Sequence, residues 1–170
     1  MRWLVDGYNV IRRSPDLSGL ERQGLEPARA ALCRQLAGLA RASGDTFTVV
    51  FDGQGAGGSG LGAGGVRVLF SSARETADRV IARLARDGGA VVSSDRAVRD
   101  AARRAGATSI STEDFLARLE RARPPARAEG EPPVDKDEEA DEAPRGPRKG
   151  NPRRLSKEDR AKARALDRLR

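Results

Sequence analysis

Three short, mostly apolar runs in the chain each lead into an aspartate. Residues 3–5 precede Asp6, residues 46–51 precede Asp52, and residues 90–94 precede Asp95. Runs of this length are typical of buried parallel strands, whose carboxyl ends meet at one edge of a sheet and form a crevice for ligands. We therefore expect these carboxylates to converge. Carboxylates hold hard divalent cations, so the pattern predicts a site for Mg²⁺ or Mn²⁺ that activates water.

The chain has no histidine, and its first lysine is Lys136. The missing histidine excludes a Ser-His-Asp triad, a His-ligated zinc site and acid–base catalysis by imidazole. The missing lysine excludes a P-loop within the first 135 residues, because a P-loop needs a lysine on the phosphates. Any metal ion must therefore be bound by oxygen atoms.

Two of the acidic candidates also have a simpler explanation. Asp6 ends the innermost predicted strand, where a carboxylate is costly unless a cation neutralises it, and that cation is either a metal ion or an arginine. Asp78 lies at the flank of the apolar stripe of a predicted helix, so it either overlooks the edge of the sheet or is a surface charge. Together with Asp95, these residues are our candidate catalytic residues and metal ligands.

Three further assignments each admit two roles. Glu75 is either a ligand or the last residue of a capping box that begins at Ser72. Asp95 is either a metal ligand or the N-cap of the helix that follows it. Asp52 either binds metal or holds the Gly-rich turn after it by a side-chain hydrogen bond, and we favour the supporting role.

Other polar and aromatic residues near the strand ends are candidates for substrate contacts. Asn9 can hydrogen-bond to the Asp6 carboxylate or to a phosphate and so orient a ligand. Tyr8 either stacks on an unpaired base or packs in the core. We expect arginines near the strand ends to bind phosphates, namely Arg12, Arg13, Arg74 and Arg96.

The segments that must position these residues alternate between strands and helices. Strands are predicted at 3–5, 46–51, 66–70, 90–94 and 107–110, and helices at about 27–42, from Ser72, at 96–105 and from Ser111. Residues 12–24 are expected to form a loop, because Ser14-Pro15-Asp16 is a turn sequence. This order predicts an α/β fold, a three-layer sandwich with a mostly parallel five-stranded sheet.

A glycine-rich stretch at residues 53–65 follows the second predicted strand and contains a formal G-x-G-x-x-G motif at Gly55, Gly57 and Gly60. A dinucleotide-binding motif must open a helix, whereas this stretch leads into the predicted strand at 66–70. We therefore interpret it as a mobile loop beside the site. It is short for a parallel crossover.

The composition changes after residue 120, the predicted end of the folded domain. Residues 121–154 are rich in proline and charge and poor in aliphatic residues, which predicts a disordered linker. Arg145 to Arg170 holds 11 Lys and Arg against 3 acids, in a chain of net charge +7. Such a block is typical of contact with nucleic acid, the alternative being a solubilising tail. Residues 155–170 are predicted to form a basic helix, with Ser156 and Asp159 as a capping box, that orders mainly on a partner.

Cys33 is the only cysteine. No internal disulfide is possible, so a reducing cytoplasm is the expected location. Because Cys33 neighbours Leu32 and Leu36 in a predicted helix, we expect a buried hydrophobic residue rather than a nucleophile. The apolar runs are too short for a signal peptide or a membrane span.

Four segments resemble a known family in sequence and order. They are DGYNVI at 6–11, VFDG at 50–53, ETAD at 75–78 and SSDR at 93–96. Together they resemble the NYN domain family, specifically the YacP-like branch of PIN-related ribonucleases, over about residues 1–120. The chain departs from that pattern in the glycine-rich loop at 53–65 and in the basic C-terminal extension.

The resemblance implies a PIN-like fold and Mg²⁺- or Mn²⁺-dependent cleavage of RNA. It places Asp6, Asp78 and Asp95 at the acidic positions of the family and Asn9 in its signature. It also implies a partner, because YacP-like proteins are associated with translating ribosomes and mRNA cleavage. The alternative function is a non-catalytic RNA- or ribosome-binding module with a degenerate PIN-like site.

Overall fold

A computed structural model describes residues 1–53, 60–61, 63–72, 74–122 and 156–169 of the chain. The centre of the glycine-rich stretch and residues 123–155 lie outside the described residues. The predicted loop mobility and the predicted disordered linker therefore stay predictions. None of the described helices combines the length and the apolar character that crossing a membrane requires.

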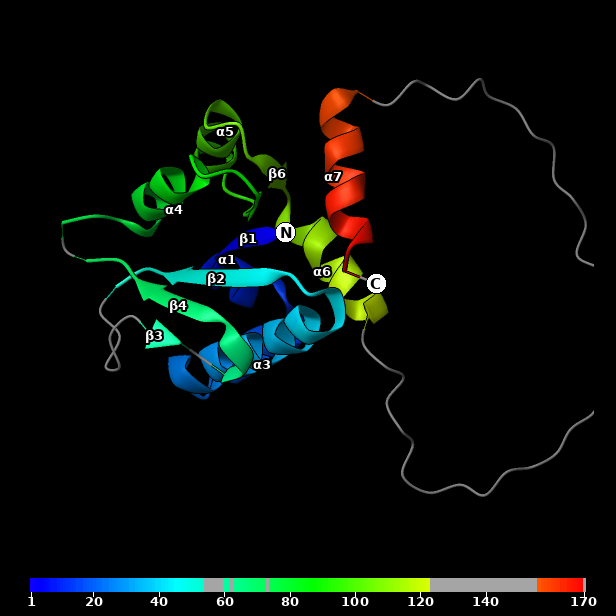
Figure 1. The fold of residues 1–170 in the computed structure, drawn as a ribbon. Coiled ribbons are helices and arrows are strands. Elements are labelled where there is room, and N and C mark those ends of the chain that lie inside the picture. Colours follow the sequence, from blue (N-terminus) through cyan, green and yellow to red (C-terminus); the bar gives the residue numbers. More distant parts are fainter. Residues whose placement is uncertain (54–59, 62, 73, 123–155, 170) are drawn as a thin grey trace, which may run out of the picture.

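The centre of the molecule is a sheet in which five parallel strands run in the order β4-β2-β1-β5-β6 (Figure 1). The strands are β1 Arg2–Asp6, β2 Thr46–Phe51, β4 Arg67–Phe70, β5 Ala90–Val92 and β6 Thr108–Ile110. A two-residue strand, β3 Gly60–Leu61, pairs antiparallel with the outer edge of β4. The predicted five-stranded, mostly parallel sheet is confirmed, and β1 lies at its centre.

Helices cover both faces of the sheet and complete three layers (Figure 1). One face is packed against α1 Gly7–Arg13, α2 Pro15–Glu21, α3 Leu25–Ser43, α6 Thr112–Ala122 and α7 Lys157–Asp167. The other face is packed against α4 Ala77–Ala85 and α5 Arg96–Arg104. This arrangement confirms the predicted three-layer α/β sandwich.

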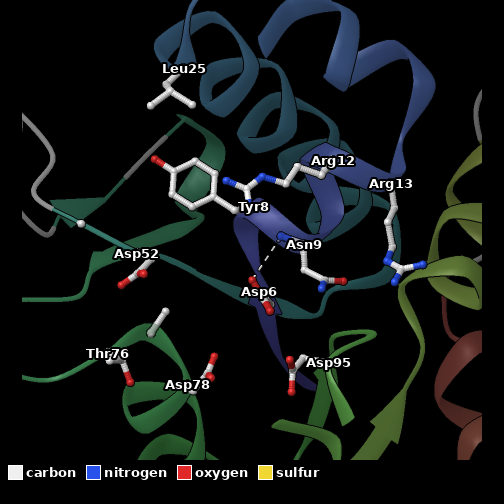
Figure 2. A pocket seen from close by; sticks show the side chains of 12 residues that line it. Asp6, Tyr8, Asn9, Arg12, Arg13, Leu25, Asp52, Thr76, Asp78 and Asp95 are labelled. Atoms are coloured by element: carbon white, nitrogen blue, oxygen red, sulfur yellow. Dashed lines mark hydrogen bonds between the residues drawn. The ribbon is translucent and has the colours of Figure 1, made fainter. Parts of the chain in front are cut away.

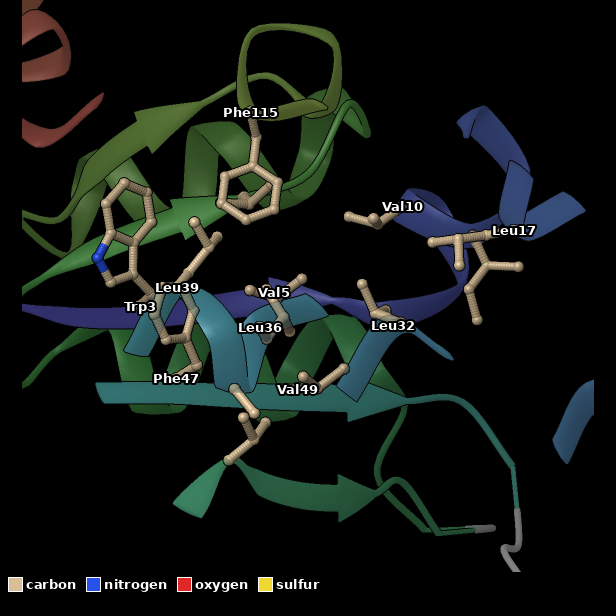
Figure 3. Packing of buried hydrophobic residues seen from close by; sticks show 14 of the residues in the cluster. Trp3, Val5, Val10, Leu17, Leu32, Leu36, Leu39, Phe47, Val49 and Phe115 are labelled. Atoms are coloured by element: carbon tan, nitrogen blue, oxygen red, sulfur yellow. The ribbon is translucent and has the colours of Figure 1, made fainter. Parts of the chain in front are cut away.

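The two buried faces explain why the strand sequences read as continuous apolar runs. Side chains alternate along β1, so Trp3 and Val5 enter the larger core while Leu4 enters the core under α4 and α5. In the larger core the Trp3 ring stacks on Phe47 with centroids 5.8 Å apart and is tilted against Phe115 at the same distance (Figure 3). Strands with this pattern can lie only inside a sheet covered on both sides.

The prediction of a loop at residues 12–24 is wrong, because α1 and α2 occupy most of that stretch. The Asp6 side chain caps α1 by accepting the Asn9 backbone N–H. Ser14 caps α2 in the same way, with Pro15 at the first helical position. A Ser-Pro-Asp sequence suits both a turn and a helix start, and here the second role applies.

The prediction that a capping box at Ser72 and Glu75 starts a helix is also wrong, because α4 begins later, at Ala77, with Thr76 as its N-cap. The Ser72 hydroxyl instead accepts the backbone N–H groups of Arg74 and Glu75. A serine followed three residues later by glutamate thus forms a local turn that precedes the helix.

The described residues of the glycine-rich connection between β2 and β4 form no helix as long as those of the other crossovers. They form β3 and a short turn at Ala63–Gly65 before β4, and none of these described elements is the helix that a dinucleotide-binding motif opens. Gly64 has a φ of +66°, and a Cβ there would lie 2.4 Å from the Cβ of Ala37 on α3. Part of this glycine content therefore serves close packing.

The basic C-terminal helix α7 packs on the folded domain beside α6 and β6 (Figure 1). Ser156 caps it by accepting the Asp159 N–H, as predicted. Leu169 is 1% exposed, and Arg168 binds the buried Asp45 across 123 residues of sequence. The expectation that this segment orders mainly on an external partner is therefore wrong, because the chain itself supplies the surface.

Cys33 is buried on α3, where burial raises the pKa of its thiol. This fits the predicted packing role, because a neutral thiol is a poor nucleophile.

Candidate active site

A pocket of about 840 Å³ opens at the carboxyl end of the central strand β1 (Figure 2). The chain leaves β1 toward β2 on one side and later returns to β5 on the other, so this is the point where the strand order reverses, the usual place for ligands in such sheets. The pocket is lined by Asp6, Tyr8, Asn9, Arg12, Arg13, Leu25, Asp52, Gly53, Thr76, Ala77, Asp78 and Asp95.

Asp6 lies at the floor of the pocket, as the last residue of β1. Its Oδ2 accepts the Ser93 hydroxyl at 2.9 Å, and its Oδ1 accepts the Asn9 backbone N–H at 3.2 Å. Burial raises the pKa of Asp6, these two hydrogen bonds lower it in part, and the negative charges of Asp78 and Asp95 raise it further. The fold thus holds a carboxylate in a place that disfavours its charge.

Gly7 allows α1 to begin directly at the end of the strand. A Cβ at this position would lie 2.3 Å from the Phe51 ring and 2.9 Å from Val49. Because no side chain fits there, Asp6 can be both the end of β1 and the cap of α1, which fixes its direction.

Asp78 and Asp52 line the pocket on the side of β2 and α4 (Figure 2). Asp78 lies in the first helical turn and is exposed overall. Its pKa is still raised, first by the partial loss of hydration of the carboxylate at the pocket and then by the negative charges of Asp95 and Asp52. Asp52 accepts the Ser71 hydroxyl at 2.5 Å, and the same hydroxyl accepts the Gly53 N–H. Asp52 therefore holds its turn through Ser71, in line with its predicted supporting role.

Asp95 caps α5 and also lines the pocket. Its Oδ1 accepts the N–H groups of Ala97 at 2.7 Å and of Val98 at 3.1 Å. Its own N–H donates to the hydroxyl of Ser93, the residue that also binds Asp6. The two roles considered for Asp95 are thus compatible, since the cap sets its position in the pocket.

In the described part of the chain, no arginine or lysine forms an ion pair with the pocket carboxylates Asp6, Asp52, Asp78 and Asp95. Their oxygens form the donor set that Mg²⁺ or Mn²⁺ prefers. The charges of Asp78 and Asp95 help to raise the pKa of Asp6, and those of Asp95 and Asp52 help to raise the pKa of Asp78, so these groups lie close enough to interact. As they stand, no three acidic groups among the described residues surround a point where an ion could bind. The carboxylates share a pocket without closing on one centre.

Asn9 ties three parts of the site together. Its side-chain oxygen accepts the Ser94 N–H at 3.0 Å and the Thr112 hydroxyl at 2.6 Å. These bonds join α1 to the segment that carries Asp95 and to the start of α6. The predicted hydrogen bond to Asp6 is made by the backbone N–H of Asn9, whereas its side chain holds Ser94 and Thr112. Contact with a phosphate stays a prediction.

Sequence reasoning missed three hydroxyl residues that support the site: Ser71, Ser93 and Thr112. All three are buried, and each lies just after one of the parallel strands. The sequence did contain a signal for these residues. Each is a hydroxyl residue that follows a buried strand and lies close to a strand-end aspartate, in sequence or in the predicted sheet.

The structure brings two of the four predicted phosphate-binding arginines to the pocket. Arg12 and Arg13 line it, whereas Arg74 and Arg96 are exposed and lie outside the lining residues. The Arg12 side chain is 69% exposed, and its Nε lies 3.7 Å from Glu21. Arg12 can therefore turn toward a ligand at little cost.

Glu75 plays neither of its two predicted roles among the described residues. Its carboxylate accepts two hydrogen bonds from Arg83, each of 3.1 Å, and these lower the pKa of Glu75. It does not cap α4 and does not line the pocket.

Tyr8 is half-buried, and its position packs one part of the ring against the core while leaving the side chain in the pocket lining, so stacking on a base stays a prediction. Its ring packs at 60° against Phe51 with centroids 5.3 Å apart, and its hydroxyl accepts a hydrogen bond from Arg29. The same side chain lines the pocket above Asp6 (Figure 2).

Known proteins are similar to this chain in sequence and in fold. YacP of Bacillus subtilis (strain 168), an uncharacterized protein, is 37% identical over 84 residues, which cover 48% of this chain and 49% of the relative. That match spans about half the length of the curated relative. Two crystal structures of Rae1 (YacP) from Bacillus subtilis, one of a point mutant, superpose with TM-scores of 0.63 and, for the mutant, 0.61. Both are 31% identical and cover 71% of this chain, and the matches cover 74% and 75% of the solved chains.

The profile of the YacP-like NYN domain matches residues 3–168, nearly the whole chain. The match extends across the sheet, the pocket and α7. The chain belongs to the YacP-like NYN domain family, which has a nuclease-type fold related to PIN domains.

Proposed function

We propose that this protein is a metal-dependent endoribonuclease that hydrolyses phosphodiester bonds of RNA. One observation carries the proposal: four carboxylates from separate elements line one pocket and have no cationic partner among the described residues. Such a group is costly to assemble unless a cation joins it during function. The resemblance to YacP-like proteins makes mRNA on ribosomes the substrate to test first.

Asp6, Asp78 and Asp95 are the residues that would hold Mg²⁺ or Mn²⁺. A bound ion of this kind lowers the pKa of a water molecule and stabilises the leaving oxygen of a phosphodiester. Ser93 and the Asn9 N–H keep the Asp6 oxygens in place. Asp95 is fixed by its bonds to the first turn of α5.

Arg12 and Arg13 supply positive charge on the wall that faces the carboxylates (Figure 2). Arg13 pairs with Glu113, and Arg12 is mostly exposed. Guanidinium groups there can bind the phosphates that flank the reacting one and counter the repulsion between RNA and the acidic floor.

A second group of cations extends the proposed contact with nucleic acid to α7. Lys162 and Arg168 bind Asp114 and Asp45, so these two fix the helix to the domain. Arg160 and Arg164 are exposed and form no ion pair with a described residue. They are two cations in the described part of the basic tail that are available for phosphates. The single buried cysteine fits a cytoplasmic location.

The proposal is tested by incubating the purified protein with single-stranded and structured RNAs in Mn²⁺ or in EDTA. We expect cleavage in the presence of Mn²⁺ and no cleavage in EDTA. Asp6→Asn and Asp78→Asn should each lower the rate by at least about 100-fold, because each removes a group that holds the ion. The matched controls are Asp100→Asn and Glu75→Gln, which remove acids outside the pocket and should leave the rate unchanged. Cleavage by Asp6→Asn at the rate of the unaltered protein would contradict the assignment.

The second candidate is a non-catalytic module that binds RNA or the ribosome. It is favoured by the absence, among the described residues, of three acids already arranged around one point. This candidate predicts RNA binding without cleavage in any divalent metal, and the same assay separates it from the nuclease.

A further inference from the structure

We infer that Tyr8 forms a stacking subsite for one unpaired nucleobase beside the acidic pocket, and that Arg29 is the positioning residue that holds the Tyr8 ring there. The inference rests on the proposed function for the identity of the ligand as RNA. It adds which part of the RNA the aromatic wall recognises.

Arg29 projects from α3 into an unusual environment for a cation. Its side chain is only 11% exposed, and its guanidinium carbon lies 5.4 Å from the ring centres of Tyr8 and Phe51 and 5.1 Å from that of Phe70. Its Nε is buried without a hydrogen-bond partner among the described residues. An aliphatic residue at this place would avoid the cost of burying a guanidinium group.

Arg29 donates hydrogen bonds that an aliphatic residue could not donate. One terminal nitrogen donates to the Tyr8 hydroxyl, and the other donates to Glu26 at 3.1 Å at the surface. The charge also lies over aromatic faces, which attract cations. Arg29 therefore holds the Tyr8 ring at two points, its hydroxyl and its face, while Phe51 supports it by packing.

The wall that Tyr8 belongs to has the chemistry of a base-binding surface. Leu25, at 44% exposure, is the one large exposed hydrophobic residue among the described ones, and it lines the same pocket. The guanidinium carbon of Arg12 lies 5.6 Å from the Tyr8 ring centre. Figure 2 shows these three side chains on one wall, with Asp78 and Asp95 on the opposite wall. The pocket thus has an acidic half and an aromatic half.

A nucleobase fits the aromatic half because it is flat, polarisable and able to stack on both a phenol ring and a guanidinium plane. A base inside a duplex has its faces covered, so the substrate class is single-stranded RNA or an unpaired position. Loss of one stacked base typically weakens binding by about 5- to 100-fold.

The test uses the fact that Tyr8 is the only tyrosine in the chain. Protein labelled with 3-fluorotyrosine gives one ¹⁹F resonance, which reports on Tyr8 alone. It is titrated in EDTA, where no cleavage occurs, with an eight-nucleotide oligouridylate and with an abasic oligonucleotide of the same length and charge. We expect the oligouridylate to shift the resonance and to bind about 5- to 100-fold more tightly than the abasic strand.

Variants separate positioning from general stability. Tyr8→Ala should remove the preference for the base-containing strand, and Tyr8→Phe should keep most of it. Arg29→Met should reduce the preference, and Arg29→Lys should restore part of it, because an ammonium group can still donate to the phenol oxygen. Arg34→Met, an exposed position on the same helix, is the control for loss of charge. Thermal unfolding is measured for each variant.

Equal affinity of the unaltered protein for both oligonucleotides overturns the base subsite. A lower melting temperature of Arg29→Met with an unchanged preference for the base-containing strand overturns the positioning role of Arg29. Absence of cleavage in Mn²⁺ with the preference intact contradicts only the nuclease. Failure to bind either strand contradicts the subsite and the RNA-binding part of the proposed function together.

Discussion

Two aspartates, the buried Asp45 and the half-buried Asp6, lie at opposite ends of the same pair of strands and differ in their partners. Asp45 precedes β2 and accepts hydrogen bonds from the Trp3 indole at 2.9 Å, from Arg168 at 3.0 Å and from the amino group of Met1. Burial alone would raise the pKa of Asp45, but the bonds from Arg168, Met1 and Trp3 together hold it below its usual value. This carboxylate is charged, paired and structural.

Asp6, at the carboxyl end of β1, accepts hydrogen bonds from just two donors of the described residues, the neutral Ser93 hydroxyl and Asn9 N–H, and its pKa is raised. The protein thus pairs Asp45 with two cationic groups, whereas no cationic group of the described residues forms an ion pair with Asp6. The difference indicates that the pocket carboxylates leave a place for a cation from solution, whereas Asp45 serves to join the N-terminus, the sheet and α7.

The largest effect on stability is expected from Asp45→Asn. It should lower the free energy of unfolding by about 2–3 kcal/mol, because one neutral amide replaces a carboxylate that binds two cations and an indole. The estimate is at the low end for a buried ion pair, since the partly exposed Arg168 can return to water. Urea unfolding measures it, with the exposed Asp87→Asn at the same end of the sheet as a control. Equal stability of the two variants would show that the Asp45 carboxylate does not stabilise the fold.

Asn9→Ala should act on the pocket without removing a carboxylate. It deletes the oxygen that holds Ser94 and Thr112, so the segment bearing Asp95 loses its fixed position, and RNA cleavage should fall by about 10- to 100-fold. Thr112→Ser keeps the hydroxyl that donates to Asn9 and should cleave at nearly the original rate. Single-turnover kinetics in Mn²⁺ compare them, and an undiminished rate of Asn9→Ala would show that the clamp is dispensable.

Asp6→Asn should change stability with the opposite sign to Asp45→Asn. In metal-free buffer at neutral pH we expect a gain of about 0.5–1 kcal/mol, because the substitution removes a charge that the fold disfavours and asparagine is also a good N-cap. The measurement is urea unfolding in EDTA. A loss of stability as large as that of Asp45→Asn would show that Asp6 is a structural carboxylate as well.

The effects of Asp6→Asn and Asp45→Asn on stability should also depend on pH in opposite ways, and this is a smaller effect. The raised pKa of Asp6 means that the folded state holds this proton more tightly than the unfolded chain, so the folded state loses stability as pH rises from the ordinary value of 3.8 through the raised value. The advantage of Asp6→Asn should therefore appear above pH 3.8 and vanish below it. Asp45 has a lowered pKa, so its contribution is complete above 3.8 and is lost as pH falls through the lowered value. Unfolding curves from pH 3 to 7 in EDTA test both, and parallel curves for the two variants would contradict this assignment.

The sequence predicted the sheet and the strand-end aspartates well, because their signals are local. An apolar run that stops at an acid is visible in Trp3 to Asp6, and parallel strands necessarily bring such ends together. Asp78 was accessible from the helical spacing of Val80 and Ile81, which are buried while Asp78 faces the pocket.

The missed features depend on contacts between distant residues or on sequences with two meanings. Ser93 binds Asp6 across 87 residues, so its place directly after a buried strand marked it as a candidate, but its partner is visible only in the fold. Glu75 matched the pattern of a capping box, but its carboxylate accepts hydrogen bonds from Arg83 instead. The docking of α7 could not be foreseen, because its apolar stripe is short and its main anchor is Arg168 on Asp45, a pairing that only the fold creates.

The central claim is that the pocket carboxylates bind a divalent cation because no cationic side chain in the described part of the chain forms an ion pair with them. Calorimetric titration with MnCl₂ in the absence of RNA tests it most directly, using the unaltered protein, Asp6→Asn, Asp78→Asn and the surface control Asp100→Asn. We predict saturable Mn²⁺ binding to the unaltered protein and to the control, and its loss in both pocket variants. No saturable binding to the unaltered protein, or unchanged affinity in Asp6→Asn, would contradict the account.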